Sequence, residues 1–269
     1  MTIDFETETS VNTFRDRLRQ FLNVVFAIAQ AVSPLFADIT GIGQPIWTRS
    51  DVIETPATPA TYTFFIWLFI FLTCIGYSIY QALPSRRKNP FLRSIGFFTA
   101  TAFFGSTLWE IDNQLQGVNW LSVVLIIFVL FTISNAFVEV VRRRASLTNA
   151  ERWFVALPVS VFTGWESIAT FAVISQALKA GGFDYFGLSE VNFSIVTVIV
   201  AGIFGTVVTF LSKGNWYCGL AIIWALIGIV LGNITGQQNT AVAVTAGGMA
   251  VLVAVTLLGA QMLDEGSRI

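Results

Sequence analysis

Two tryptophans inside apolar segments are the residues of this chain best suited to hold a planar ligand. Trp67 lies five residues into an apolar run that begins at Tyr62, and Trp165 follows Gly164 in the middle of another run. An aromatic ring offers a flat apolar face for stacking, and a neighbouring glycine leaves a notch beside it. The alternatives are a tryptophan at the membrane interface for Trp67 and ordinary helix packing for the Gly164–Trp165 pair.

Glu166 is the ionisable residue that we place near the centre of a membrane-spanning segment. A charge at such a position costs about 2.5–3.5 kcal/mol on insertion scales, so the carboxyl has to be protonated or to contact polar groups. Four hydroxyl-bearing residues of the same segment are available: Ser160, Thr163, Ser167 and Thr170. The position is compatible with a hydrogen-bonded structural acid and with a proton-coupled acid in a pocket.

The residues needed for most other chemistry are missing. The chain contains no histidine, which is the commonest metal ligand, the usual ligand of haem iron and a frequent general base. Cys74 and Cys218 both fall in apolar runs and resemble small buried apolar residues. With no glycine-rich phosphate loop and no nucleophile–base set, the sequence predicts neither an enzyme nor a metal site. The net charge of −1 and the lack of a basic arm indicate no nucleic-acid partner.

Composition places these residues in a membrane protein. Of the 269 residues, 55% are hydrophobic and 12% are charged, and the mean hydropathy is +0.72. A soluble domain carries about 25% charged residues. Eight apolar runs have the length needed to span a bilayer, where each must be helical. They cover residues 21–38, 62–83, 91–109, 120–141, 153–178, 193–212, 216–234 and 240–262. The sequence therefore predicts an all-α polytopic membrane protein with eight transmembrane helices.

The distribution of basic residues predicts the orientation. With eight spans and a cytoplasmic N-terminus, thirteen of the fifteen basic residues lie in cytoplasmic segments, as the positive-inside rule requires. Both termini are then cytoplasmic, and our default location is a bacterial inner membrane. Residues 1–20 form a cytoplasmic amphipathic segment, and the apolar spacing over residues 11–25 predicts a helix on the inner membrane surface.

The amino-acid composition of the spans changes near residue 185. Residues 21–180 contain five spans rich in Phe and Trp, whereas residues 181–269 contain three spans rich in Gly, Ala, Val and Thr. Small residues let helices approach closely. We expect Gly202, Gly205, Gly247 and Gly248 to be packing notches, and the last three helices to offer a surface for a homodimer or a membrane partner.

Three motifs in this order resemble the tryptophan-rich sensory protein family, also called the translocator protein or peripheral benzodiazepine receptor family. A proline-rich loop precedes FFIW at residues 64–67, the third span ends in FFGSTLW at 103–109, and the fifth carries GWESIAT at 164–170. The resemblance covers about residues 20–180 and is closest to the longer bacterial branch with extra C-terminal helices. The chain has Phe71 where the family often has Tyr, and Glu166 where an apolar residue is usual.

The resemblance implies a five-helix bundle that binds a flat hydrophobic molecule, such as a porphyrin or related tetrapyrrole, in a sensory or translocating role. Because the chain has no histidine, a metal-free porphyrin or a bilin suits it better than a His-ligated haem. The expected ligand-binding residues are Trp67, Phe71, Trp109, Trp165, Glu166 and Ala169, with Trp47 in the loop at 39–61 as part of a lid. Two other roles stay open: a secondary transporter with Glu166 as its coupling acid, and a structural or accessory membrane subunit.

Overall fold

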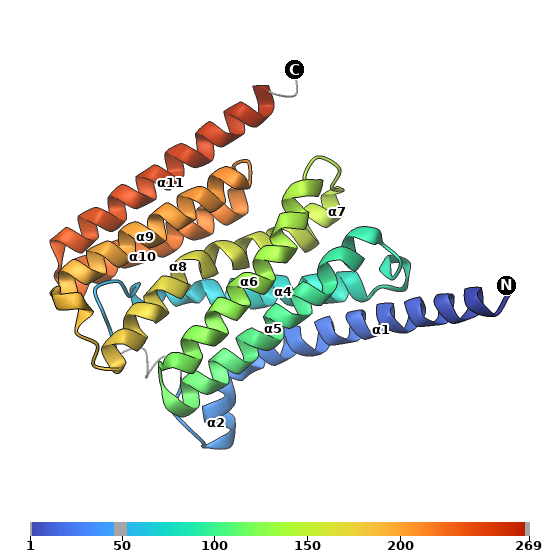
Figure 1. Ribbon diagram of the computed structural model, residues 1–269, viewed down its shortest axis with the longest axis horizontal. Helices are drawn as coiled ribbons and strands as arrows, with labels where there is room; N and C mark the ends of the chain where they lie inside the picture. The colour runs from blue at the N-terminus through green and yellow to red at the C-terminus, as the bar shows by residue number, and fades with distance from the viewer. Residues whose placement is uncertain (1, 46–52, 267–269) are drawn as a thin grey trace.

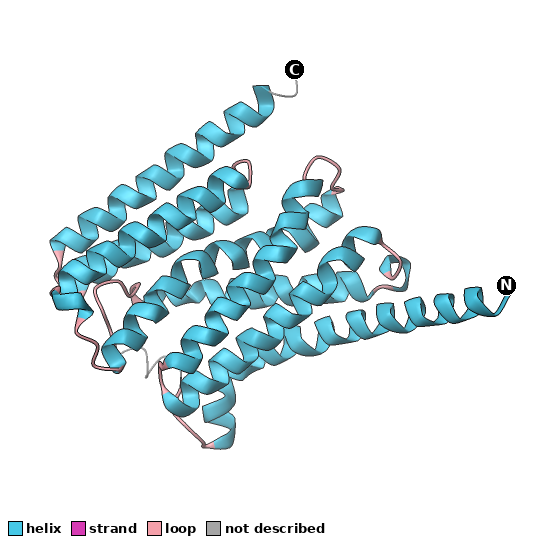
Figure 2. Ribbon diagram, in the orientation of Figure 1, coloured by secondary structure: helices cyan, strands magenta, loops and turns pink. Residues whose placement is uncertain are grey.

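The described part of the chain, residues 2–45 and 53–266 of a computed structural model, contains helices and loops and no strand (Figure 2). Side chains are described over residues 13–45 and 53–264. Eight long helices lie alongside one another (Figure 1). They are α1 (Thr2–Val32), α4 (Ile66–Ala82), α5 (Pro90–Gln116), α6 (Trp120–Arg143), α8 (Leu157–Ala180), α9 (Glu190–Leu211), α10 (Trp216–Thr235) and α11 (Thr240–Gly266). The predicted all-α fold is confirmed.

Short helical turns join or extend these long helices. They are η1 (Ser33–Leu35), α2 (Phe36–Thr40), η2 (Thr61–Phe65), η3 (Pro84–Arg86), α7 (Asn149–Glu151), the π-helical turn η4 (Arg152–Ala156) and η5 (Tyr185–Gly187). The π-helical turn comes directly before α8, and Pro158 occupies the first turn of that helix. Proline is tolerated there because the first turn leaves its backbone N–H groups unpaired within the helix.

Seven helical segments of the described chain are long and apolar enough to cross a membrane. They are Thr13–Thr40, Thr61–Ala82, Trp120–Arg143, Asn149–Ala180, Glu190–Leu211, Trp216–Thr235 and Thr240–Asp264. The first of them contains the predicted span at 21–38. The remaining predicted span, the third in the chain at 91–109, corresponds to α5. This helix is longer and more polar than expected.

The polarity of α5 has a packing explanation. This helix lies between α1 and α6, so much of its surface meets protein (Figure 1). Thr99, Ser106, Glu110 and Asn113 are all buried in these contacts and take part in hydrogen bonds. Polar residues are tolerated within a membrane bundle when they face its interior and find partners there. The bundle thus contains seven or eight helices suited to crossing a membrane.

Side-chain caps mark where several of the long helices begin. The Asn89 side chain accepts hydrogen bonds from the first backbone N–H groups of α5, and Asn119 and Ser122 form a capping box at the start of α6. Ser189 and Asn215 cap α9 and α10 in the same way. Each cap satisfies donors that the helix itself leaves free.

The helix α1 has its polar face inward. Asp16, Gln20 and Asn23 are buried, and the Asn23 amide donates to the backbone oxygen of Gly96 on α5 at 2.6 Å. Phe14 on the opposite face is 68% exposed. The predicted helix over residues 11–25 is confirmed, and its position on the membrane surface stays a prediction. This part of α1 packs into the bundle, because its polar side chains find partners on α4 and α5.

The helix α8 is at the centre of the bundle. Its most apolar stretch is 83% buried, against 28–50% for the other six segments. It contacts α4 and α6 on one side and α9 and α10 on the other, and α11 packs on α9 and α10 (Figure 1). The predicted boundary between the five-helix and three-helix units, near residue 181, therefore comes directly after α8, and helices of both units pack on α8.

Two of the four glycines expected to be packing notches have that role. A side chain at Gly202 would meet Met249, and one at Gly205 would meet Ile222. A side chain at Gly248 would meet nothing within 4 Å, and one at Gly247 would reach only one atom, at 3.9 Å. The prediction is wrong for this last pair, because α11 is the outermost helix and turns these residues away from tight contacts.

Candidate functional site

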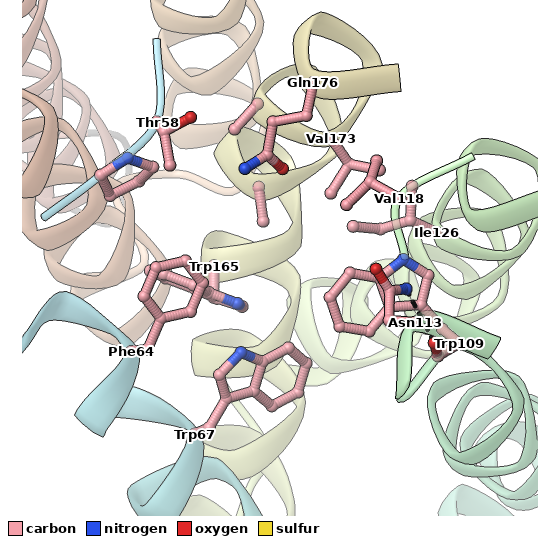
Figure 3. Close-up of a pocket in the computed structure, with 13 residues that line it drawn as sticks. Thr58, Phe64, Trp67, Trp109, Asn113, Val118, Ile126, Trp165, Val173 and Gln176 are labelled. Carbon is pink, nitrogen blue, oxygen red and sulfur yellow. Dashed lines mark hydrogen bonds between the residues drawn. The ribbon is translucent and has the colours of Figure 1, made fainter. Parts of the chain in front are cut away.

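A small cavity lies among aromatic side chains of α4, α5 and α8 (Figure 3). Its volume is about 30 Å³, which is room for one or two water molecules. The loop before α4 and the start of α6 complete its wall. The lining residues are Thr58, Pro59, Phe64, Trp67, Trp109, Asn113, Val118, Ile126, Trp165, Ala169, Ala172, Val173 and Gln176.

Trp67 is the centre of an aromatic cluster beside this cavity. Its ring stacks on Phe71 with centroids 5.3 Å apart and lies nearly parallel to Trp109 at 6.5 Å. Phe162 and Trp165 meet the same ring edge-on, at 5.8 and 6.2 Å. These separations fall within the range in which aromatic pairs attract one another. Three helices thus supply one continuous aromatic wall.

Two indole nitrogens of this wall lack hydrogen-bond partners. Trp109 Nε1 and Trp165 Nε1 are buried, and no atom of the described residues accepts from either. An indole nitrogen can only donate, and a buried unpaired donor costs about 1–3 kcal/mol. In Figure 3 the Gln176 side chain comes from the opposite side of the same cavity. The cavity therefore combines apolar walls with donors suited to an acceptor oxygen.

The loop that lines the cavity is held in place by α10. The backbone N–H of Ala60 donates to Gly228 O at 2.9 Å, and the Asn233 amide donates to Pro56 O at 2.7 Å. A side chain at Gly232 would come within 3.1 Å of the Ala60 nitrogen. Gly228 and Gly232 are four residues apart, the spacing that creates a groove along one helix face. One of the last three helices thus shapes the wall of the aromatic cavity.

The chain also resembles a known family of proteins over most of its length. Residues 20–259 match the family model described as TSPO-like protein. The chain belongs to the TSPO-like protein family. No curated protein and no solved structure gives a match. The TSPO-like match includes parts of all eight long helices, so the last three belong to the family region along with the first five, beyond the 20–180 range suggested by the motifs. With its apolar helices, this membership makes the chain a multi-pass membrane protein.

In this TSPO-like bundle, the predicted site residues are only partly brought together. Trp67, Trp109, Trp165 and Ala169 line the one cavity. Phe71 stacks on the far side of Trp67 and does not line it. Trp47, expected in a lid, lies outside the described residues. The part that each residue plays in ligand binding stays a prediction.

Glu166 lies next to Trp165 in sequence but outside the cavity lining. Its side chain is 1% exposed, and its Oε2 has no hydrogen-bond partner within the described chain. The hydroxyl groups expected to contact its carboxyl form no described hydrogen bond with it. Thr163 and Ser167 donate instead to backbone oxygens one turn earlier on α8, at 2.8 and 2.7 Å. Hydroxyl groups within helices commonly bond in this way.

Glu110 and Asp112 follow the predicted end of the third span at residue 109, and both are buried within α5, which continues to Gln116. Glu110 accepts hydrogen bonds from Ser33 and Ser106. It also lies close enough to Glu166 for the two carboxyls to interact electrostatically. Glu166 is therefore not the only acid inside the bundle. Sequence spacing could not reveal this, because the serine partner on η1 is 77 positions away.

Gln176 and Asn113 are the polar lining residues on long helices that sequence reasoning missed, and Thr58 in the loop before α4 is a third. Gln176 follows Trp165, Ala169 and Val173 at the three- and four-residue spacing of one helix face. That spacing was a usable signal, because glutamine is uncommon in an apolar span. Asn113 offered no comparable signal, since it falls beyond the predicted end of its span at residue 109.

No group of three or more His, Cys, Asp or Glu residues able to hold a metal ion occurs in the part of the chain that the structure describes. Cys74 and Cys218 are both buried and unpaired, as small apolar residues would be.

Proposed function

We propose that this TSPO-like protein binds a planar hydrophobic small molecule of the porphyrin or tetrapyrrole type, in a sensory or translocating role. The observation that carries the proposal is the meeting of Trp67, Trp109 and Trp165 around one cavity, with two buried indole N–H groups unpartnered. A planar π-system would stack on these rings, and its carboxylate or carbonyl oxygens would accept from the indoles.

Binding of a molecule as large as a tetrapyrrole requires the cavity to widen. Pockets for drug-sized ligands hold roughly 300–1,000 Å³, whereas this cavity holds about 30 Å³. Four lining residues lie outside the long helices: Thr58, Pro59, Phe64 and Val118. We expect the Trp67 ring to turn, and the hydrogen bonds that hold the loop of Thr58 and Pro59 to α10 to break, when ligand enters.

A substitution at Trp165 tests the proposal. Protoporphyrin added to the purified protein in detergent is expected to quench tryptophan fluorescence saturably. Trp165→Phe keeps an aromatic ring but removes the N–H donor, so the Kd is expected to rise about five- to tenfold. Trp153→Phe is the matched control, because Trp153 is 63% exposed and does not line the cavity. A wild-type protein that shows no saturable quenching by any tetrapyrrole would contradict the proposal.

The membrane orientation and the partners are proposed on separate grounds. The basic loop residues favour cytoplasmic termini in a bacterial inner membrane, and labelling of single cysteines in intact cells would test this. A homodimer or a membrane partner on α9–α11 stays a proposal as well, tested by the mass of the purified complex. The buried Cys74 and Cys218 would not interfere with labelling.

A secondary transporter is the second candidate, favoured by the buried Glu166 with its unpartnered Oε2. In liposomes, such a protein would exchange tetrapyrrole across the membrane at a rate that depends on an imposed pH gradient. Glu166→Gln is expected to abolish that dependence, whereas Glu139→Gln, an acid paired with Arg142 on the surface, is expected to keep it. Equal dependence in Glu166→Gln and the wild type would remove Glu166 as a coupling acid.

A further inference from the structure

A second cavity lies between the first turns of α5 and the part of α1 beside them. Its volume is about 360 Å³, far larger than the space among the tryptophans. The lining residues are Arg15, Asp16, Arg19, Pro90, Arg93, Ser94 and Phe97. It lies at the end of the bundle that holds the α4–α5 and α6–α7 loops (Figure 1). Those loops carry basic runs at residues 86–88 and 142–144.

Arg19 is the unusual residue of this cavity. Its side chain is 1% exposed, and only Nη2 is satisfied, by a 2.9 Å hydrogen bond to the backbone oxygen of Arg87. Nε and Nη1 have no acceptor among the described residues. A buried guanidinium is costly unless its donors are paired. The structure thus contains two strong donors, nine-tenths or more buried, on a residue that lines an open cavity.

The backbone of α5 leaves room for this arginine. A side chain at Gly96 would overlap the Arg19 side chain, with its Cβ about 2.5 Å from the Arg19 Cδ. The absence of that side chain lets the arginine stem lie against α5. Gly96 O is also the acceptor for Asn23, one turn further along α1. The position of Arg19 is therefore built by its neighbours.

The charges around the cavity leave it positive. Asp16 forms an ion pair with Arg93 and lies 4.0 Å from Arg19 Nη2. The Arg15 guanidinium stacks over the Phe97 ring at 5.5 Å. Three guanidinium groups thus face a single carboxylate. Arg15 is exposed and can turn toward a ligand, whereas the exposed Arg93 donates to Asp16 through Nε and Nη2. Arginine forks match the oxygen geometry of phosphate.

We propose that this cavity binds the phosphate group of an anionic ligand, held by Arg15, Arg19 and Arg93. The surroundings favour a phospholipid headgroup over free phosphate. Phe14 and Leu18 on the adjoining surface of α1 are exposed, at 68% and 37%, and offer apolar contact to an acyl chain. An anionic leaflet also attracts clusters of basic residues at the membrane surface. This site is independent of the aromatic cavity and of the function proposed for it.

The test measures the thermal unfolding of the full chain in dodecyl maltoside with phosphatidylglycerol, phosphatidylcholine or inorganic phosphate added. Phosphatidylglycerol is expected to raise the Tm saturably, and phosphatidylcholine much less. Arg15→Gln is expected to weaken the apparent Kd about fivefold, since a basic residue near an anionic lipid contributes about 1 kcal/mol. Arg17→Gln is the matched control, because Arg17 is exposed on the same helix and does not line the cavity.

A second variant covers the case in which Arg15→Gln does not fold. Arg93→Lys keeps the charge facing Asp16 but loses the guanidinium fork, and weaker binding is again expected. Saturable stabilisation by inorganic phosphate that depends on Arg15, without an effect of the lipid, would support the phosphate site and assign it to a free anion. Equal binding by Arg15→Gln, Arg93→Lys and Arg17→Gln would overturn the proposal, as would the absence of saturable stabilisation by either phosphate source.

Discussion

Replacing Trp165 with alanine is expected to lower the free energy of unfolding by about 3 kcal/mol or more. The Trp165 side chain is 1% exposed and packs edge-on against Phe64 and Trp67, with centroids 5.6 and 6.2 Å apart. In a bilayer, helix association depends on van der Waals contact more than on removal of apolar surface from water. Alanine would remove those contacts and leave a void that α8, packed on four other helices, cannot collapse to fill.

The measurement is reversible unfolding in mixed micelles with increasing denaturing detergent, followed by circular dichroism. Trp153→Ala is the control, because it deletes the same side chain at a position that is 63% exposed. The control is expected to change the free energy of unfolding by less than about 1 kcal/mol. Similar losses in the two variants would mean that the aromatic cluster does not hold the bundle together.

Replacing Gly164 with valine is expected to separate α8 from α10. A Cβ at this position would overlap the backbone oxygen of Cys218 and lie 2.9 Å from the Ala221 Cβ. Backbone atoms of a packed helix cannot turn aside as a flexible side chain can, so the helices must shift. Overpacking of this kind typically costs about 1–3 kcal/mol. The glycine beside Trp165 is therefore a helix-packing residue, the alternative that its sequence context left open.

Gly248→Val is the matched control for this substitution, since it adds the same side chain to a helix position with nothing within 4 Å. Both variants carry the same difference in helix propensity, so the difference between them measures the contact with α10 alone. The same unfolding experiment is expected to show a large loss for Gly164→Val and little change for Gly248→Val. A loss of equal size in both would show that α8 and α10 are not in close contact.

Much of the fold could be predicted because the bilayer limits the possible structures. Apolar runs of sufficient length have to be helical, so α6, α9 and α10 begin and end within three residues of their predicted spans. The helix α5 continues beyond the apolar run that ends at residue 109, as far as Gln116. The carboxyls of Glu110 and Asp112 lie in this extension, and hydrogen-bond partners elsewhere in the chain allow both to be buried.

Sequence reasoning could predict only those groups of site residues that lie on a single helix. Trp165 and Ala169 are four residues apart and therefore share a face of α8, which also includes Gln176. That Trp67 and Trp109 lie beside that face depends on how α4 and α5 are rotated about their own axes. Local sequence does not specify this rotation, since Phe71 lies on α4 one turn after Trp67 yet does not line the cavity.

That tryptophans inside apolar segments are embedded in a helical membrane bundle follows from the amino-acid sequence, because hydrophobic length and helical spacing are local properties. That Trp67, Trp109 and Trp165 surround one small cavity, with a loop held by α10 as part of its wall, follows only from how the helices pack. The same is true of the burial of Arg19 beside a second, larger cavity. These arrangements arise from contacts between residues far apart in the chain, whose energies depend on the packing of several helices at once.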